Sequence, residues 1–345
     1  MFNFFRRHRR LERAELKTRI EEYCRRWLRE RLGAAPDADL SFLPMTKGHN
    51  TLLRGVAVEG IGPLVLRFFP LRRDLRTHAA EHETVHRLLL ELGLPVAPFY
   101  FRDNSPDTLK FLAAEVTAEK FLEGRNLTIH DVANPAAPQF EPLLDLVASL
   151  HQRVSNSFGR PLRAADDSYS PAEWYARRAA HCLARLRQDR YLSASEADGW
   201  ETFFASKSSI LSQRPHFSLI HGDLQSANLI VDPKGKLWII DFGTVRYEHF
   251  AIDLLQLQSG LFARVPETFK TFLDCYLKKR GGALRRSFDA DGPFLAAFLT
   301  LEKAYSHCAK ANKVQRGKRR EYGDTETSHR HAATKLLNRV RTLVR

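Results

Sequence analysis

The sequence has few cysteines and no long uncharged apolar run. Its four cysteines, Cys24, Cys182, Cys275 and Cys308, are far apart and form no CxxC pair. This spacing argues against a disulfide framework or a zinc ribbon and favours a reducing compartment. No uncharged apolar run approaches the roughly 18 residues of a membrane-spanning helix, and residues 1–10 lack the apolar core of a secretory signal. We therefore expect a cytoplasmic protein.

The positive charge of the chain lies at its two ends. The formal net charge is +14 over 345 residues. Residues 1–35 have 11 basic and 5 acidic side chains, and residues 303–345 have 12 basic and 3 acidic side chains. The middle of the chain, residues 36–302, has 31 basic and 32 acidic side chains and is nearly neutral. The basic ends could contact an anionic membrane, such as the inner membrane surface, although a solvated, partly mobile tail is the simpler interpretation. Nothing resembles a nucleic-acid-binding module, so no nucleic-acid partner is expected.

The period of the apolar residues changes along the chain. A leading helix is indicated by helical spacing of Leu16, Ile20, Tyr23 and Trp27, and it ends at Gly33. The next segments read as strands at 52–58, 64–69, 96–102 and 109–116, with a helix at 78–92. Helical patterns then dominate, at 140–153, 171–188, 196–212, 250–262, 266–280 and 293–310, around a hairpin with strands at 217–220, 229–231 and 237–240. Strands followed by helices predict an α+β protein with two lobes.

The stretch from His221 to Gly243 carries the clearest chemical signal. The sequences HGDLQSAN at 221–228 and DFG at 241–243 place polar side chains at the ends of short apolar strands. Asp223, Asn228 and Asp241 can therefore converge on one point. One carboxylate could accept a proton from a hydroxyl, and the other oxygen atoms could bind Mg²⁺. Phosphoryl transfer requires such a set of groups.

These motifs resemble those of the eukaryotic-like kinases and, more closely, the aminoglycoside phosphotransferase and choline kinase family. The resemblance covers about residues 15–305 and is carried by HGDLQSANLIV and WIIDFG, supported by Lys47–Thr51, Leu64–Arg67, Phe121–Arg125 and Asp253. It implies an α+β, bilobal protein-kinase-like fold with an antiparallel sheet in the N-terminal lobe and a mostly helical C-terminal lobe. The implied boundaries are 1–118 for the first lobe, 119–124 for the hinge, and 125–345 for the second lobe with its basic tail.

The resemblance also implies a role for each matching residue. Asp223 would be the catalytic base, and Asn228 and Asp241 would bind Mg²⁺. Arg67 would contact the ATP phosphates in place of the Lys of protein kinases and would pair with Glu83. The other residues expected to bind the cofactor are Gly48 and Asn50 in the phosphate loop and Lys120 and Leu122 beside the backbone that would bind adenine.

The activity implied by the resemblance is transfer of the γ-phosphoryl group of ATP, with Mg²⁺, to a hydroxyl of a small molecule. A sugar, an amino alcohol and a lipid-linked saccharide are all open as acceptors. Gln225 stands where protein kinases have Lys and small-molecule kinases often have His, so it does not specify the acceptor. No Ala-Pro-Glu segment follows Asp241, which favours a small-molecule acceptor over a protein.

Two other functions fit parts of the sequence. A degenerate family member could keep the fold as a binding module without catalysis. In addition, His82-Glu83-x-x-His86 matches the HExxH motif of zinc metalloproteases, in which two His side chains on one helix face bind zinc. Leu89 and Leu92 occupy the positions at which the longer metzincin pattern requires Gly and His, although a more distant Glu could still be the third ligand. We therefore favour the kinase interpretation.

Overall fold

The structure is a computed structural model that describes residues 13–43, 52–71, 79–161, 170–209, 211, 216–315 and 325–344. The chain divides into two compact units, neither of which is continuous in sequence. The first contains Met1–Leu127 and Ala227–Gly243, and the second contains Thr128–Ser226 and Thr244–Arg345. The segment 227–243 returns to the first unit because its strand β9 (Leu229–Val231) pairs with β6 (Arg125–Asn126). The lobe boundaries that the resemblance implied, with a hinge at 119–124, stay a prediction.

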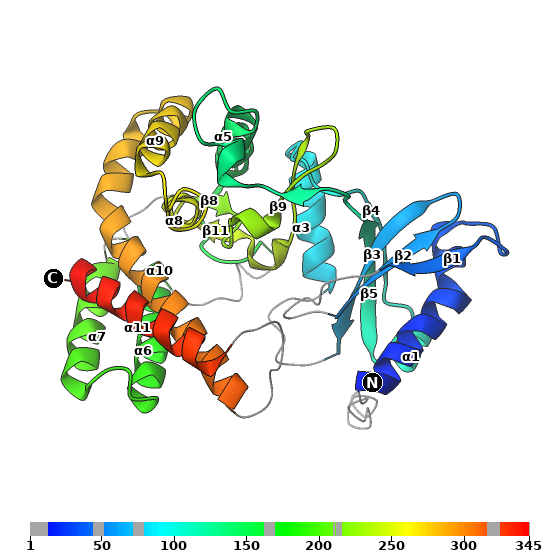
Figure 1. Ribbon diagram of the computed structural model, residues 1–345, viewed down its shortest axis with the longest axis horizontal. Coiled ribbons are helices and arrows are strands. Elements are labelled where there is room, and N and C mark those ends of the chain that lie inside the picture. Colours follow the sequence, from blue (N-terminus) through cyan, green and yellow to red (C-terminus); the bar gives the residue numbers. More distant parts are fainter. Residues whose placement is uncertain are drawn as a thin grey trace. The chain divides into compact units, whose positions relative to one another are not determined.

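A five-stranded antiparallel sheet is the centre of the first unit (Figure 1). Its order is β1-β2-β3-β5-β4, so the last two strands are exchanged relative to the sequence. The predicted strands at 52–58 and 64–69 are confirmed. The strands are β1 (Leu40–Leu43), β2 (Leu52–Val58), β3 (Gly62–Pro70), β4 (Phe99–Asp103) and β5 (Ala114–Lys120). A smaller sheet of order β10-β9-β6 includes β10 (Leu237–Ile239).

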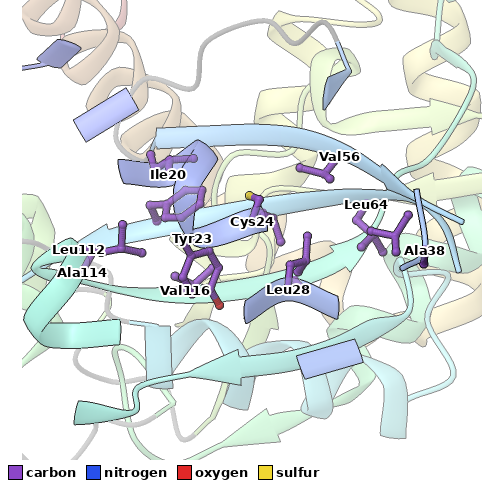
Figure 2. Packing of buried hydrophobic residues seen from close by; sticks show 14 residues of the cluster. Ile20, Tyr23, Cys24, Leu28, Ala38, Val56, Leu64, Leu112, Ala114 and Val116 are labelled. Atoms are coloured by element: carbon purple, nitrogen blue, oxygen red, sulfur yellow. The ribbon is translucent and has the colours of Figure 1, made fainter. Parts of the chain in front are cut away.

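The predicted leading helix is confirmed and supplies part of the core of the first unit. It runs as α1 (Arg13–Tyr23), a π-helical segment Cys24–Leu28 and α2 (Arg29–Leu32), and Gly33 ends it in the left-handed conformation with φ 66°. The side chains of Ile20, Tyr23, Cys24 and Leu28 are buried among those of the sheet, as Figure 2 shows. The leading helix therefore has a well-packed apolar face.

One predicted strand is partly wrong. The segment 109–116 was expected to be extended, but α4 (Pro106–Leu112) occupies its first half and β5 its second half. The hydroxyl of Ser105 accepts a hydrogen bond from the backbone N–H of Thr108, and Pro106 stands at the first helical position. Because Ser at the N-cap followed by Pro is a helix start signal, the short helix competes successfully with the strand pattern. The predicted helix at 78–92 is confirmed as α3 (Ala79–Glu91).

The second unit is mostly helical, as the sequence predicts. Its small sheet has the order β11-β8-β7. The strands are β7 (Val154–Ser155), β8 (Phe217–Ile220) and β11 (Arg246–Glu248). The helices are α5 (Phe140–Gln152), α6 (Pro171–Gln188), α7 (Ala194–Ser208), α8 (Ala251–Ser259), α9 (Pro266–Arg280), α10 (Ala283–Gln315) and α11 (Glu326–Leu343). Short 3₁₀ segments occur at Ile129–Asp131, Ser226–Asn228 and Phe242–Thr244.

The C-terminal end of the chain is not the solvated tail that its charge suggested. Helix α11 packs against α10, and His329, Ala333, Leu337 and Val340 form its buried face. Thr325 caps the helix, since its hydroxyl accepts from the N–H of Ser328. Burial of this face against α10 holds α11 in the fold, although the residues around the face are basic. The aromatic and basic residues 1–10 lie outside the described residues. Among the described helices, none is long and apolar enough to cross a membrane.

We expect the leading helix to be essential for stability. Leu28→Ala should lower the free energy of unfolding by about 2–5 kcal/mol, because Leu28 is fully buried and truncation leaves a cavity. Leu90→Ala on α3 is the matched control, since Leu90 is 45% exposed and should change stability little. Denaturant unfolding of both variants measures the difference. Equal midpoints would show that the leading helix is not part of the folded core.

Candidate active site

The loop His221–Gln225 follows β8 and is fixed by one carboxylate. The side chain of Asp253 on α8 accepts hydrogen bonds from the backbone N–H groups of His221 and Gly222, each at 2.8 Å. Asp253 is completely buried, so it cannot exchange these donors for water. Since charge-assisted hydrogen bonds of this kind are strong, they hold the backbone immediately before Asp223. Asp253 therefore has a structural role in this loop.

A second side chain of α8 fixes the other side of Asp223. One turn after Asp253, the amide of Gln256 accepts from the N–H of Leu224 at 2.7 Å and donates to the carbonyl of Gly222 at 2.8 Å. Positions three apart on a helix face the same way, so the two side chains of α8 act on one loop. The Asp223 backbone is thereby held on both sides, and its partly exposed side chain is left at the end of a rigid support.

Gly222 is required by both its conformation and its surroundings. Its φ is 76°, which is the left-handed region that favours glycine. A Cβ atom there would lie 2.6 Å from the carbonyl oxygen of Thr244. The Thr244 hydroxyl also donates to the carbonyl of His221 at 2.9 Å. The segment after DFG therefore packs tightly on this loop within the second unit.

A buried histidine completes the support of the loop. Nε2 of His151 lies 3.2 Å from the Asp253 carboxylate, and its Nδ1 lies 2.8 Å from the hydroxyl of Tyr276. Burial alone would raise the pKa of Asp253, but the contacts with His151 and His221 outweigh it and lower that pKa. The carboxylate therefore stays ionised and continues to accept the backbone hydrogen bonds.

The predicted catalytic base has a neutral neighbour. The side-chain amide of Gln225 donates a hydrogen bond to the Asp223 carboxylate at 3.1 Å. A Lys or His at this position could carry a positive charge, whereas Gln supplies only a dipole. Gln225 therefore orients Asp223 without supplying a charge for the phosphates or the acceptor.

The two predicted metal ligands lie at the same end of a hairpin in the first unit. Asn228 directly precedes β9, and Asp241 follows β10 after Ile240. The strands are antiparallel, and the N–H of Ile240 donates to the carbonyl of Asn228 at 3.0 Å. Asp241 has φ 65°, an uncommon and strained conformation for a residue with a side chain. Amide and carboxylate oxygen atoms are the kind of ligand that Mg²⁺ prefers.

The predicted ion pair between Arg67 and Glu83 is wrong. Nε of Arg67 on β3 lies 3.1 Å from the carboxylate of Glu119 on β5. Arg67 is opposite Thr117 in the register of these strands, and Glu119 lies two residues further on the same face. Glu83 instead pairs with Arg87 at 2.7 Å and with Arg102 at 3.0 Å.

Glu119 is the centre of a buried polar cluster. Nε2 of His82 lies 2.6 Å from the same carboxylate that pairs with Arg67. Burial would raise the pKa of Glu119, but Arg67 and His82 outweigh it and lower that pKa to about 2. His82 and the buried His86 also pack against the ring of Phe242 of DFG, with centroids 6.1 Å and 5.6 Å away. The cluster thus links α3 to the segment that carries Asp241.

The zinc interpretation of HExxH gains no support from this geometry. In the part of the chain that the structure describes, no group of three His, Cys, Asp or Glu side chains is placed to hold a metal ion. Both histidines face the packed cluster around Phe242, and the intervening Glu83 points to arginines. Glu83, the base that a zinc protease would need, pairs instead with Arg87 and Arg102.

Two of the predicted cofactor-binding residues lie in the expected hinge. The backbone N–H of Lys120 already donates to the carbonyl of Pro98 at 2.8 Å, and that of Phe121 donates to Pro63 at 2.9 Å. Lys120 is exposed, and Leu122 is half-buried after the end of β5. The predicted phosphate-loop residues, Gly48 and Asn50, lie outside the described residues.

Sequence reasoning missed Gln256 and Glu119. Gln256 could have been found from its spacing, since it is three residues after Asp253 on a helix already expected to support the loop. Glu119 required the strand register, because its distance from Arg67 in the sequence says nothing about the pairing of β3 with β5. A cross-strand partner is visible only once the sheet order is known.

Asp253→Asn should destabilise the protein by about 2–4 kcal/mol. An amide group would direct donors at backbone N–H groups that now donate to a carboxylate, which leaves buried donors unpaired. Chemical unfolding measures the loss. Asp198→Asn is the control, because Asp198 is exposed on α7 and pairs only with Arg187 at the surface. Similar unfolding midpoints for the two variants would contradict the role of Asp253.

The low pKa of Glu119 predicts a specific loss of stability in acid. Its folded pKa of about 2 lies below the ordinary value of 4.5, so its stabilising effect is present above pH 4.5 and is lost as the pH falls toward 2. The free energy of unfolding of the Glu119→Gln variant should therefore fall less steeply over this range than that of the unmodified chain. Glu91→Gln controls for the change of net charge, and an unchanged slope in Glu119→Gln would refute the assignment.

The comparisons with known proteins agree with this architecture. The sequence model of the phosphotransferase enzyme family matches residues 49–288. No curated protein matches the chain. A protein of Ralstonia eutropha assigned as an aminoglycoside phosphotransferase is 15% identical, with a TM-score of 0.64 over 94% of this chain and 98% of that one.

Two further solved structures are similar over most of their length. Plasmodium vivax ethanolamine kinase is 12% identical, with a TM-score of 0.59 over 96% of this chain and 95% of that one. The streptomycin–ATP–APH(2″)-IIa complex is 14% identical, with a TM-score of 0.57 over 96% and 97%. These likenesses show the kinase-like α+β fold, with an antiparallel sheet in the N-terminal part and a mostly helical C-terminal part. The chain belongs to the phosphotransferase enzyme family and is a small-molecule kinase.

Proposed function

We propose that this kinase transfers the γ-phosphoryl group of ATP, with Mg²⁺, to a hydroxyl of a small molecule. The observation that carries the proposal is the fixed backbone on both sides of Asp223, which Asp253 and Gln256 hold by hydrogen bonds of 2.7–2.8 Å. A carboxylate on such a support can be oriented before substrate binds. Catalysis of phosphoryl transfer depends mainly on positioning and charge neutralisation, so a rigid base is what the reaction requires.

Each proposed role follows from the local chemistry. The Asp223 carboxylate accepts the hydroxyl proton of the acceptor, and the Gln225 amide holds that carboxylate in place. Asn228 and Asp241 would hold Mg²⁺ through their oxygen atoms. When bound, this ion supplies neutralisation of the phosphate charge. All three polar groups are present, which favours catalysis over a degenerate binding module.

Arg67 is the proposed phosphate contact on the first unit. Its Nε donates a hydrogen bond to Glu119, which fixes the guanidinium group. The terminal N–H groups of the guanidinium are then directed to a nucleotide phosphate. Glu83, with its arginine partners, has no part in this contact. A purine could use the backbone of Leu122, since the N–H groups of Lys120 and Phe121 already donate elsewhere.

Family membership and the fold support ATP as the donor. The similar APH(2″)-IIa structure is a complex with streptomycin and ATP, and the similar Plasmodium vivax protein is an ethanolamine kinase. A sugar, an amino alcohol and a lipid-linked saccharide all offer such a hydroxyl. Contact of the basic ends with an anionic membrane remains a prediction from the sequence.

The proposal is tested by adding Mg·ATP and a panel of metabolites to the purified chain. Nucleotide at about 100 times its Kd should stabilise the fold by about 2.7 kcal/mol, seen as a rise in Tm. Asp223→Asn should keep that rise but lower kcat about 10²–10⁴-fold, because it removes only the base. Phosphorylated product is measured by mass spectrometry.

The exposed Asp289→Asn on α10 is the control for this test and should keep normal turnover. Absence of any nucleotide-dependent rise in Tm would refute ATP binding. Unchanged turnover in Asp223→Asn would refute the assignment of the base.

A further inference from the structure

The second unit contains a pocket that is lined in part by α8, the helix that supports the loop of Asp223. Its volume is about 170 Å³, on the order of ten times the space that one water molecule requires. Three helices line it: α8 with Ser259, α10 with Lys303 and His307, and α11 with Arg339. Among the described residues that line it there is no Asp or Glu. The pocket therefore has two basic side chains, Lys303 and Arg339, and no carboxylate among its described lining residues.

The two cations are not neutralised locally. The ammonium of Lys303 donates to the neutral hydroxyl of Ser259 at 2.8 Å. Within the described residues, neither Lys303 nor Arg339 forms an ion pair, whereas Lys279 on α9 contacts two carboxylates. Burial lowers the pKa of Lys303, and the nearby Arg339 lowers it further. Lys303 is half-buried and Arg339 is exposed, and two positive charges near each other favour an incoming anion.

Helix α8 connects this pocket to the base. Gln256 holds the backbone on either side of Asp223, and Ser259 lies three residues, about one turn, further along the same helix. The Asp223 carboxylate also acts electrostatically on Lys303, which it shifts in the opposite direction from Arg339. A molecule with an anionic group beside Lys303 can therefore extend a hydroxyl toward Asp223.

We propose that this pocket binds a phosphate or carboxylate of the acceptor, so that the enzyme phosphorylates an anionic hydroxyl compound. This inference rests on the proposed function, because it takes Asp223 as the base. Lys303 and Arg339 bind the anion by charge-assisted hydrogen bonds, and Ser259 adds a neutral contact. A cationic acceptor such as an amino alcohol would meet two positive charges in this pocket and would be disfavoured.

The test measures binding to the full chain saturated with Mg·ADP, by calorimetry. Glucose 6-phosphate and gluconate probe the two anions, and glucose and ethanolamine are the neutral and cationic counterparts. At least one anionic compound should bind, and the two counterparts should bind at least tenfold more weakly. Lys303→Met and Arg339→Met should each weaken anion binding about tenfold or more.

Matched variants separate a charge effect from misfolding. Lys303→Arg should retain most of the binding, since it keeps the positive charge. Lys335→Met removes an exposed cation from α11 outside the pocket and should bind normally. A stronger response to glucose 6-phosphate would identify phosphate, and a stronger response to gluconate would identify carboxylate; either supports the proposal.

The proposal is overturned if neither anion binds, or if Lys303→Met and Arg339→Met bind as well as the unmodified chain. Preferential binding of ethanolamine would also overturn it. A failure of Mg·ADP itself to bind would refute the proposed function instead. Titration of the nucleotide-free chain with the same anions would then still show whether the pocket binds an anion.

Discussion

The buried carboxylate of Asp253 is the constraint on which the catalytic half of the structure depends. It accepts the N–H groups of His221 and Gly222, contacts His151, and has no access to solvent. A buried ionised group is tolerated only when its hydrogen bonds are satisfied. Movement of the loop would remove two donors from Asp253 and leave a buried charge without them. The position of Asp223 is therefore a consequence of the packing of α8, with Gln256 completing the hold.

The first unit applies the same principle to its own functional side chains. Arg67 and His82 share the carboxylate of Glu119, and Phe242 packs on the rings of His82 and His86. A guanidinium paired in this way keeps a fixed direction, and a packed Phe242 places the adjoining Asp241. Each unit thus has one buried carboxylate that holds the groups around a proposed site residue in place.

The sequence predicted the parts of this arrangement that depend on local pattern. The HGD and DFG motifs, the strands at 52–58 and 64–69, and the helical second unit follow from periodicity and motif spacing. The partner of Arg67 could not be predicted, because Glu119 reaches it through the register of β3 and β5. Helix α11 was not predicted, because the few residues that form its buried face lie among many basic residues. The cationic pocket required three helices distant in sequence to come together.

We propose above all that Asp223 directs the γ-phosphoryl group of ATP to an organic hydroxyl. The most direct measurement follows ³²P from γ-labelled ATP, with Mg²⁺ and a metabolite extract, and compares the label in organic products with the label in inorganic phosphate. We expect organic label with the unmodified chain and a loss of about 10²–10⁴-fold in its rate of formation with Asp223→Asn. Label found only in inorganic phosphate, or organic label formed equally fast by Asp223→Asn, would contradict it.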